Sequence, residues 1–442
     1  MHNTIETIGQ LERRVDVAVP IAEVEGEVEK RLAKLARTVK LPGFRPGHVP
    51  IKMVAQQYGP QLRSEVISDR VQASFNEAIR DQNLQVAGYP KIEPKPRAEG
   101  GGNADALEFQ ATFEVYPEVK LGDLADVTVE KPVVTLAPAD LDATLDKLRR
   151  QRATFAAVSR PAAEGDRVVV DFTGTIDGAE FGGGQARDFT ITLGEKRMLP
   201  EFEAALPGHS AGDTVEFDLV FPDDYHGKEV AGKRAHFVLT VKGVEETRLP
   251  ALDTDFAKAF GIPSGTLDDL RAEVKQNLEL EMKRRVESVV KEQVLRGLRS
   301  KAQFAVPASL VDIEAMNMLQ RAAQNLMQQG VKREDIRLAP DVFRSQAGER
   351  VTLGLLMGEL VRAHDLAARP EQVRTRVTEM AQTYEQPEAV VRWHYEKPER
   401  LADFEAQAAE QNVVDWALSK MRVVDKPTSF DALMNPGASA AA

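Results

Sequence analysis

The spacing of apolar residues changes twice along the chain, and this change limits the folds that are open to it. Between residues 165 and 241 apolar side chains alternate with polar ones, which is typical of half-buried β-strands. At 138–150 and again after Pro250 they recur every three or four positions, which is typical of amphipathic helices. The 442 residues are enough for several domains. The sequence therefore predicts a multidomain α+β protein.

Four segments of the middle stretch alternate as strands do: 168–173, 189–193, 215–219 and 235–241. Asp177-Gly178 is a strong hairpin signal. Pro200 suits the first turn of a short helix, whose apolar face would hold Leu199, Phe202 and Leu206. We therefore expect roughly five short strands around one short helix, an α+β unit of about 90 residues.

The flanking parts are mostly helical. Near the N-terminus a strand pattern at 11–19 precedes helical patterns at 24–39 and 51–79. Further helical runs cover 267–298, a segment opened by Pro307, 341–366, 371–384, 387–395 and 399–421, and no fixed repeat indicates a solenoid. We expect an N-terminal α+β domain at 1–111, a linker at 112–149 that packs with the C-terminal domain, the β-rich domain at 150–246, a helical domain at 247–433 and a disordered tail at 434–442.

Composition narrows the class of protein. The chain has no cysteine, which excludes a disulfide framework and a thiolate nucleophile. The first 20 residues lack the basic start and apolar core of a secretory signal, and no window is apolar enough for a membrane span. We therefore expect a cytoplasmic protein. A net charge of −12 argues against nucleic-acid binding over the whole surface, so a local basic patch would stand out.

One such patch lies near the N-terminus. From Lys30 to Lys52 the chain has seven Lys or Arg residues and no Asp or Glu. Within this stretch, residues 43–50 form a loop rich in Gly and Pro between two helical segments. Charge of one sign in an acidic protein predicts a polyanionic partner with salt-sensitive binding. The alternative is that Phe44 folds back as a small core plug and that the charges are only solvated.

The loop Gly-Phe-Arg-Pro-Gly-His-Val-Pro at 43–50 resembles the signature Gly-Phe-Arg-x-Gly-x-x-Pro of the trigger factor family. In that family the loop docks on the ribosome beside the exit tunnel and touches a ribosomal protein and rRNA. Many members carry Lys where this chain has Pro46 and His48, so two possible charges are missing. The resemblance implies ribosome binding through Gly43, Phe44, Arg45, Pro46, Gly47 and Pro50.

The middle stretch carries no arrangement that suits bond-breaking chemistry. It has no Ser/His/Asp spacing, no metal-binding motif and no phosphate loop, and no motif suggests a cofactor. What remains is a set of apolar and aromatic residues, and on the residues alone we expect these to be the core of a small domain. They are Phe172, Phe181, Phe189, Met198, Leu199, Phe202, Tyr225 and Phe237.

Residues from about Glu164 to Glu246 resemble the FKBP-type prolyl isomerases. The motifs lie at 165–174, 177–181, 189–194, 198–203 and 221–227. Phe202 stands where single-domain members often have Trp, and Gly182 where they have Asp, so the resemblance does not imply macrocycle binding. It implies a half-open barrel around a helix, with a shallow proline pocket lined by Phe172, Phe181, Phe189, Leu199, Phe202, Tyr225 and Phe237.

An apolar pocket fits isomerisation because no covalent bond is broken. Three hypotheses follow. The first is a ribosome-associated chaperone that also isomerises X-Pro bonds; the second is a binding chaperone with a silent FKBP-like domain; the third is a free isomerase. The loop at 43–50 argues against the third, and the aromatic pocket set argues against the second.

The resemblance to the trigger factor family covers nearly the whole chain and implies its partners. These are the ribosome and nascent or unfolded polypeptides, with no membrane and with a possible weak homodimer off the ribosome. On the residues alone, we expect the methionines of the helical region to lie in its core. The resemblance implies that some of them face unfolded chains, since Met adapts to varied partners. They are Met316, Met318, Met327 and Met357.

Overall fold

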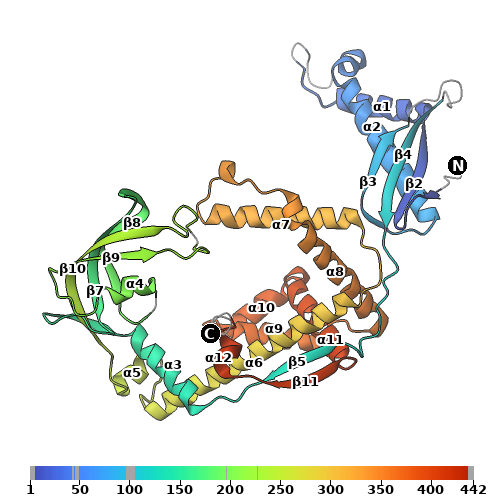
Figure 1. Cartoon of the computed structure of the whole chain (residues 1–442). Helices are drawn as coiled ribbons and strands as arrows, with labels where there is room; N and C mark the ends of the chain where they lie inside the picture. Colours follow the sequence, from blue (N-terminus) through green and yellow to red (C-terminus); the bar gives the residue numbers. More distant parts are fainter. Residues whose placement is uncertain are drawn as a thin grey trace. The chain divides into compact units, whose positions relative to one another are not determined.

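The computed structural model describes residues 5–41, 44, 49–95, 105–195, 197–225 and 227–436. The chain forms two compact units, each built from two separate stretches (Figure 1). Unit 1 comprises Met1–Lys131 and Ser288–Lys426, and unit 2 comprises Pro132–Glu287 and Pro427–Ala442. The domain boundaries expected from the sequence are a finer division and stay a prediction.

The N-terminal part of unit 1 is a four-stranded antiparallel sheet with two helices. The strands run in the order β1 (Ile5–Thr7), β2 (Glu12–Pro20), β4 (Ala106–Val115) and β3 (Val86–Pro94). Helix α1 (Ile21–Ala36) follows β2 directly, and α2 (Ile51–Asp81) continues through Pro60. Alternate residues of β2 turn inward and pack on α2, as the sequence predicts. This core includes Val15, Val17, Val19, Val66, Val71 and Phe75.

The remainder of unit 1 is helical, and every helical run expected from the sequence is present. The helices are the second part of α6 (Leu267–Ser300), α7 (Ala308–Gln328), α8 (Arg344–His364), α9 (Pro370–Ala381), α10 (Pro387–Tyr395) and α11 (Ala402–Leu418). Short 3-10 turns stand at Arg333–Asp335, Pro340–Phe343 and Pro398–Arg400. Within the described ranges, no helix is both long enough and apolar enough to cross a bilayer.

Two contacts join distant segments inside unit 1. The Glu114 carboxylate on β4 accepts hydrogen bonds from the first amides of α7, Ala308 N (3.0 Å) and Ser309 N (2.7 Å). Such amides have no partner within their own helix, so a carboxylate stabilises them. Strand β5 (Thr128–Val133) pairs with β11 (Arg422–Pro427), and the Gln293 side chain bonds both the N–H and the C=O of Glu130 (2.9 and 2.8 Å).

Unit 2 contains the β-rich part of the chain. Its sheet runs β6 (Thr154–Val158), β10 (Arg234–Arg248), β7 (Arg167–Ile176) and β8 (Ala179–Thr192), and β9 (Thr214–Val220) also pairs with β10. Asp177 and Gly178 both have positive φ, so the predicted hairpin turn is confirmed. The short helix α4 (Pro200–Ala204) packs its Phe202 into the sheet core.

A second core of unit 2 gathers segments from before and after the sheet. It joins α3 (Pro138–Gln151), α5 (Thr254–Ala259), the first part of α6 and α12 (Phe430–Met434). Leu145 and Phe256 are buried there with Leu270, and Phe430 packs against them. Met434, the first residue of the expected disordered tail, ends α12; residues 437–442 of that tail lie outside the described residues.

Candidate active site

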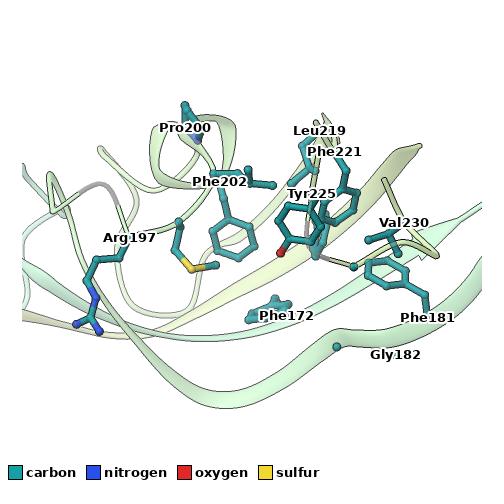
Figure 2. A pocket seen from close by; sticks show the side chains of 15 residues that line it. Phe172, Phe181, Gly182, Arg197, Pro200, Phe202, Leu219, Phe221, Tyr225 and Val230 are labelled. Atoms are coloured by element: carbon teal, nitrogen blue, oxygen red, sulfur yellow. The ribbon is translucent and has the colours of Figure 1, made fainter. Parts of the chain in front are cut away.

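Unit 2 holds an apolar cavity of about 500 Å³ between its sheet, helix α4 and the segment after β9 (Figure 2). This volume lies in the range of ligand sites in proteins. Carbon atoms dominate its wall. The lining residues are Phe172, Phe181, Gly182, Gly183, Arg197, Met198, Leu199, Pro200, Phe202, Leu219, Phe221, Tyr225, Gly227, Val230 and Phe237.

Three buried rings from three elements form the floor. Phe172 comes from β7, Phe202 from α4 and Phe237 from β10. The ring centroids lie 5.2 Å apart for Phe172 and Phe202 and 5.6 Å apart for Phe202 and Phe237, and both pairs meet edge to face. Gly174 makes this possible, since a Cβ there would lie 2.5 Å from the Phe237 ring.

The walls consist of aromatic rings and one tethered loop. Phe181 on β8 meets Phe221 edge-on at 5.9 Å, and the Phe221 and Tyr225 rings lie 4.8 Å apart. Figure 2 shows the Tyr225 hydroxyl directed toward the middle of the cavity. The Glu203 carboxylate accepts hydrogen bonds from Gly194 N (3.3 Å) and Met198 N (3.2 Å), which holds the loop before α4 in place.

Six of the seven expected pocket residues line this cavity: Phe172, Phe181, Leu199, Phe202, Tyr225 and Phe237. Phe189 does not. It is 37 % exposed, and its ring meets that of Phe172 edge to face with the centroids 5.7 Å apart. The expectation came from the resemblance to the FKBP-type isomerases; in the structure Phe189 lies opposite Val170 of β7, just beyond a register shift in this strand pair.

Several lining residues were missed by the sequence reasoning. Phe221 opens the FKBP-like motif at 221–227 and could have been found there. Val230 and Arg197 lie in irregular segments, where no periodicity marks a side chain as inward-facing. Among the described residues, no three His, Asp or Glu side chains gather closely enough to hold a metal ion.

The second expected site lies at the tip of α1 and α2. Phe44 is 38 % exposed, and its N–H donates to Leu41 O (3.1 Å). The small core between the two helix ends is built from Leu32, Ala36, Val49 and Val54 and does not include Phe44, so the core-plug interpretation is wrong. Pro50 is exposed at the start of α2. Gly43, Arg45, Pro46, Gly47 and His48 lie outside the described residues.

Part of the basic charge between Lys30 and Lys52 is neutralised by ion pairs in the structure. Arg31 forms ion pairs with Asp69 (2.8 Å) and Glu27 (3.5 Å), and Lys30 lies 3.9 Å from Glu27. These two cations are therefore partly neutralised by acidic groups on the same helix pair. Between Lys30 and Lys52, the exposed cations without an ion pair to any described residue are Lys34, Arg37, Lys40 and Lys52.

Comparisons with known proteins decide the family. Residues 1–148 match the family described as "Bacterial trigger factor protein", and residues 266–419 match the family of its C-terminal part. Residues 158–242 match the family described as "FKBP-type peptidyl-prolyl cis-trans isomerase". A trigger factor of Aromatoleum aromaticum is 50 % identical over 99 % of this chain and 100 % of its own length. One of Burkholderia mallei is 48 % identical over the full length of both chains.

The chain belongs to the trigger factor family. Its members are ribosome-associated chaperones with an FKBP-type prolyl isomerase domain, and this chain has the same domains, so the alternative of a silent domain is not favoured. A solved trigger factor chaperone covers 94 % of this chain and 99 % of its own at 17 % identity, with a TM-score of 0.45.

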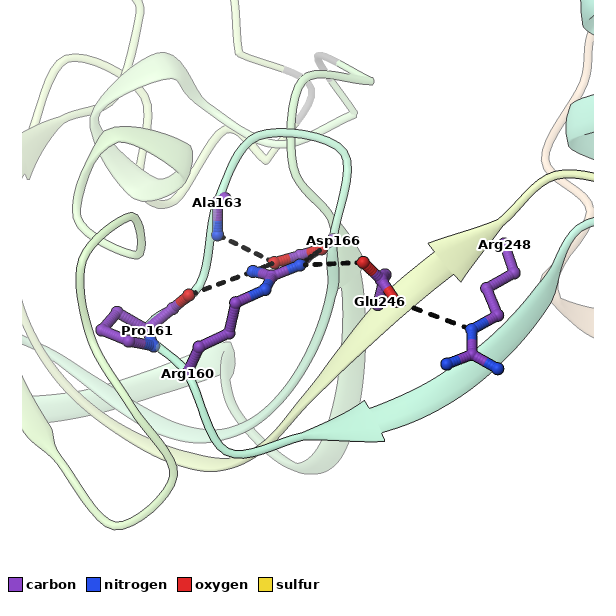
Figure 3. Close-up of polar contacts among 6 residues, drawn as sticks. All are labelled: Arg160, Pro161, Ala163, Asp166, Glu246 and Arg248. Atoms are coloured by element: carbon purple, nitrogen blue, oxygen red, sulfur yellow. Dashed lines mark hydrogen bonds and ion pairs between the residues drawn. The ribbon is translucent and has the colours of Figure 1, made fainter.

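An ion pair supports the loop beside the cavity (Figure 3). Asp166, directly before β7, is 3 % exposed, and its carboxylate accepts hydrogen bonds from both terminal nitrogens of Arg160 and from Ala163 N (2.9 Å). Its backbone C=O accepts from Leu193 N (2.9 Å), where the loop of the cavity wall begins. The Arg160 guanidinium holds the pKa of Asp166 below its usual value, despite burial.

The Asp166 ion pair predicts how unit 2 responds to acid. Because the folded pKa lies below the unfolded value of about 3.9, the stabilisation is complete above that pH and is lost as the pH falls through the folded pKa. Asp166→Asn should lower the free energy of unfolding at pH 7 by about 1–3 kcal/mol. The loss should shrink as the pH falls below the unfolded pKa of about 3.9.

Hydrogen exchange of the β7 amides is the measurement, because both tryptophans lie in unit 1 and do not report on unit 2. Asp213→Asn is the control; this carboxylate also accepts a backbone N–H, from Ser210, but is about half exposed. Equal protection of wild type and Asp166→Asn at pH 7 would contradict the prediction.

Proposed function

We propose that the cavity of unit 2 is the isomerase site and that its aromatic floor receives the proline ring of a substrate. The observation that carries this is the apolar space of about 500 Å³ above three buried rings, with almost no charge in its wall. The residues proposed to act on substrate are Phe172, Phe181, Leu199, Phe202, Tyr225 and Phe237. Phe189 supports the floor through Phe172.

The reaction does not require the protein to make or break a covalent bond. Rotation of a peptide bond is opposed by amide resonance, with a barrier of about 18–20 kcal/mol. A planar amide is more polar than a twisted one, so an apolar wall that removes water from the amide favours the twisted state. The Tyr225 hydroxyl donates to a substrate carbonyl. Lowering the barrier by about 4–8 kcal/mol gives roughly 10³–10⁶-fold acceleration.

Substitutions in the wall test the site. Phe181→Ala opens one side of the cavity and should lower kcat/KM for an X-Pro peptide by about tenfold or more. Phe202→Ala should lower it further, because it removes the floor; this variant also loses about 3–5 kcal/mol of stability, so its folding is checked by hydrogen exchange. The measurement is the rate of cis-to-trans conversion of a proline peptide.

Phe155→Ala is the matched control, since it removes a 37 % exposed ring of the same sheet that does not line the cavity. We expect its kcat/KM to stay within about threefold of wild type. A loss as large as that of Phe181→Ala would place the site elsewhere, and a wild-type rate no higher than background would refute the catalytic assignment.

We infer that the tip of α1 and α2 docks on a ribosomal protein and rRNA at the exit tunnel, through Gly43, Phe44, Arg45, Pro46, Gly47 and Pro50. Phe44 supports this as an exposed aromatic residue, a type favoured at interface hot spots. The cations Lys34, Arg37, Lys40 and Lys52 extend the surface toward phosphates.

Co-sedimentation with ribosomes separates the two contributions. Replacing Phe44, Arg45 and Pro46 by Ala should abolish most binding at every salt concentration. Replacing Lys34, Arg37, Lys40 and Lys52 by Gln should instead flatten the dependence of log affinity on log salt, by up to about 0.9 for each phosphate that is no longer neutralised. Arg63→Gln with Arg70→Gln is the control, because these arginines pair with Glu25 and Glu23 on α1. Unchanged binding of the triple alanine variant excludes docking by this loop.

We propose that unfolded chains contact exposed apolar side chains of the helical region. Tyr384 and Trp393 border a cavity with Ala389 and Val390, and the Arg400 guanidinium lies 3.8 Å over the Trp393 ring. Of the four methionines, Met316 and Met327 are exposed, Met357 is half-buried and Met318 is buried in the core of α7 and α8.

If these exposed aromatic side chains bind unfolded chains, replacing them should weaken chaperone binding without lowering the isomerase activity. Tyr384→Ala with Trp393→Ala should weaken capture of a permanently unfolded protein by about fivefold or more, since exposed aromatic residues dominate such contacts. Tyr89→Ala removes an even more exposed aromatic residue from the N-terminal sheet and is the control. Equal capture by both variants in a binding titration would exclude this surface.

The remaining proposals concern where the protein acts and what state it adopts when it is not bound to the ribosome. We propose that it acts in the cytoplasm, that it needs no cofactor, and that it forms a weak homodimer when off the ribosome. Sedimentation velocity at rising protein concentration tests the dimer. We also propose the domain boundaries near 111, 149, 246 and 433, which limited proteolysis tests.

A further inference from the structure

One carboxylate joins the two ends of the loop that precedes α4. Glu203 lies in α4 and is half-buried, and each of its oxygens accepts a hydrogen bond from that loop. Oε2 accepts from Gly194 N (3.3 Å), and Oε1 accepts from Met198 N (3.2 Å). The ends of the loop therefore meet at one side chain, although they are four positions apart in sequence.

The end of the loop that Glu203 binds continues directly into the cavity wall. Met198 and Leu199 both line the cavity, and both are half-buried. The Leu199 carbonyl accepts hydrogen bonds from Phe202 N (2.9 Å) and Glu203 N (3.2 Å). The backbone of α4 thus holds this part of the wall at Leu199, and the Glu203 side chain holds it at Met198.

A carboxylate suits this position because it offers an acceptor oxygen to each amide. A neutral amide side chain has one acceptor oxygen, and its NH2 group cannot accept the second N–H. Hydrogen bonds to an ionised acceptor are also stronger than those between neutral groups. Glu203 does not itself line the cavity, so its effect on a substrate passes through the wall that it holds.

We propose that Glu203 is a positioning residue for the isomerisation, because it keeps Met198 and Leu199 in place beside a bound proline. The proposal rests on the cavity being the isomerase site. Without these hydrogen bonds, the wall occupies this position in only a fraction of the molecules. The apparent affinity for substrate falls by that fraction, since only these molecules bind. Losing one such bond predicts a rise in KM of about three- to tenfold.

Glu203→Gln tests this inference, because it keeps the size of the side chain and removes one acceptor. KM for an X-Pro peptide should rise about three- to tenfold while kcat stays within about twofold of wild type, since a bound peptide restores the wall. A purely structural role gives the reverse result, because a smaller folded fraction lowers the apparent kcat and leaves KM unchanged. Hydrogen exchange should be faster at the Gly194 and Met198 amides, and protection of the β7 amides shows that the variant is folded.

Two further variants separate the hydrogen bonds from the charge. Glu203→Asp keeps the charge but is too short to reach both amides, so it should also raise KM. Glu201→Gln makes the same change of charge at an exposed position of α4 and should leave KM within about twofold of wild type.

Three results would overturn the inference: a wild-type KM in Glu203→Gln, a wild-type KM in Glu203→Asp, or an equally raised KM in Glu201→Gln. A wild type that does not isomerise the peptide at all refutes the proposed site itself, which is a different result.

Discussion

The pairing of β6 with the end of β10 is the constraint on which the rest of unit 2 depends. Thr154 lies opposite Arg248, so the β-rich part of the chain begins and ends at one place. Segments on both sides of it can then share one core, in which Leu145 of α3 packs with Phe256 of α5 and Leu270 of α6. A sheet with adjacent ends can be inserted into a helical protein without separating the helices that flank it.

Strand β10 also explains why the core of the sheet and the floor of the cavity are the same residues. Its 15 residues pair with β9 and β7 in the first half and with β7 and β6 in the second. Phe237 lies in the first half, where sheet and α4 meet, and Gly174 on the paired strand leaves space for its ring. The floor is therefore rigid, because moving any of the three rings would open the core. Rigidity suits a site that works by excluding water.

Local periodicity predicted most of the elements, and contacts between distant residues account for what it missed. The expected helix at 267–298 is α6 (Leu267–Ser300), since its spacing is set by residues within one turn. Strand β6 was not expected, because five residues without alternation become a strand only beside β10. Phe189 was assigned to the cavity from the resemblance, and no pattern in the sequence separates it from the phenylalanines that line the cavity. Arg31 was counted within the stretch of basic charge, but it pairs with Asp69, which lies 38 positions away in sequence.

The ion pairs between α1 and α2 explain why uncompensated positive charge gathers near the loop in an otherwise acidic protein. Glu23 and Glu25 on α1 pair with Arg70 and Arg63 on α2, so these four charges compensate one another away from the loop. Of the five cations on the described parts of α1, α2 and the segment between them that have no such partner, four lie close to the loop in sequence: Lys34, Arg37, Lys40 and Lys52. The fifth, Arg80, lies at the other end of α2. A net charge of −12 disfavours contact between RNA and the rest of the surface. Attraction to a polyanion is thereby strongest at one end of the helix pair, so charge would orient the docking that we propose before any specific contact forms.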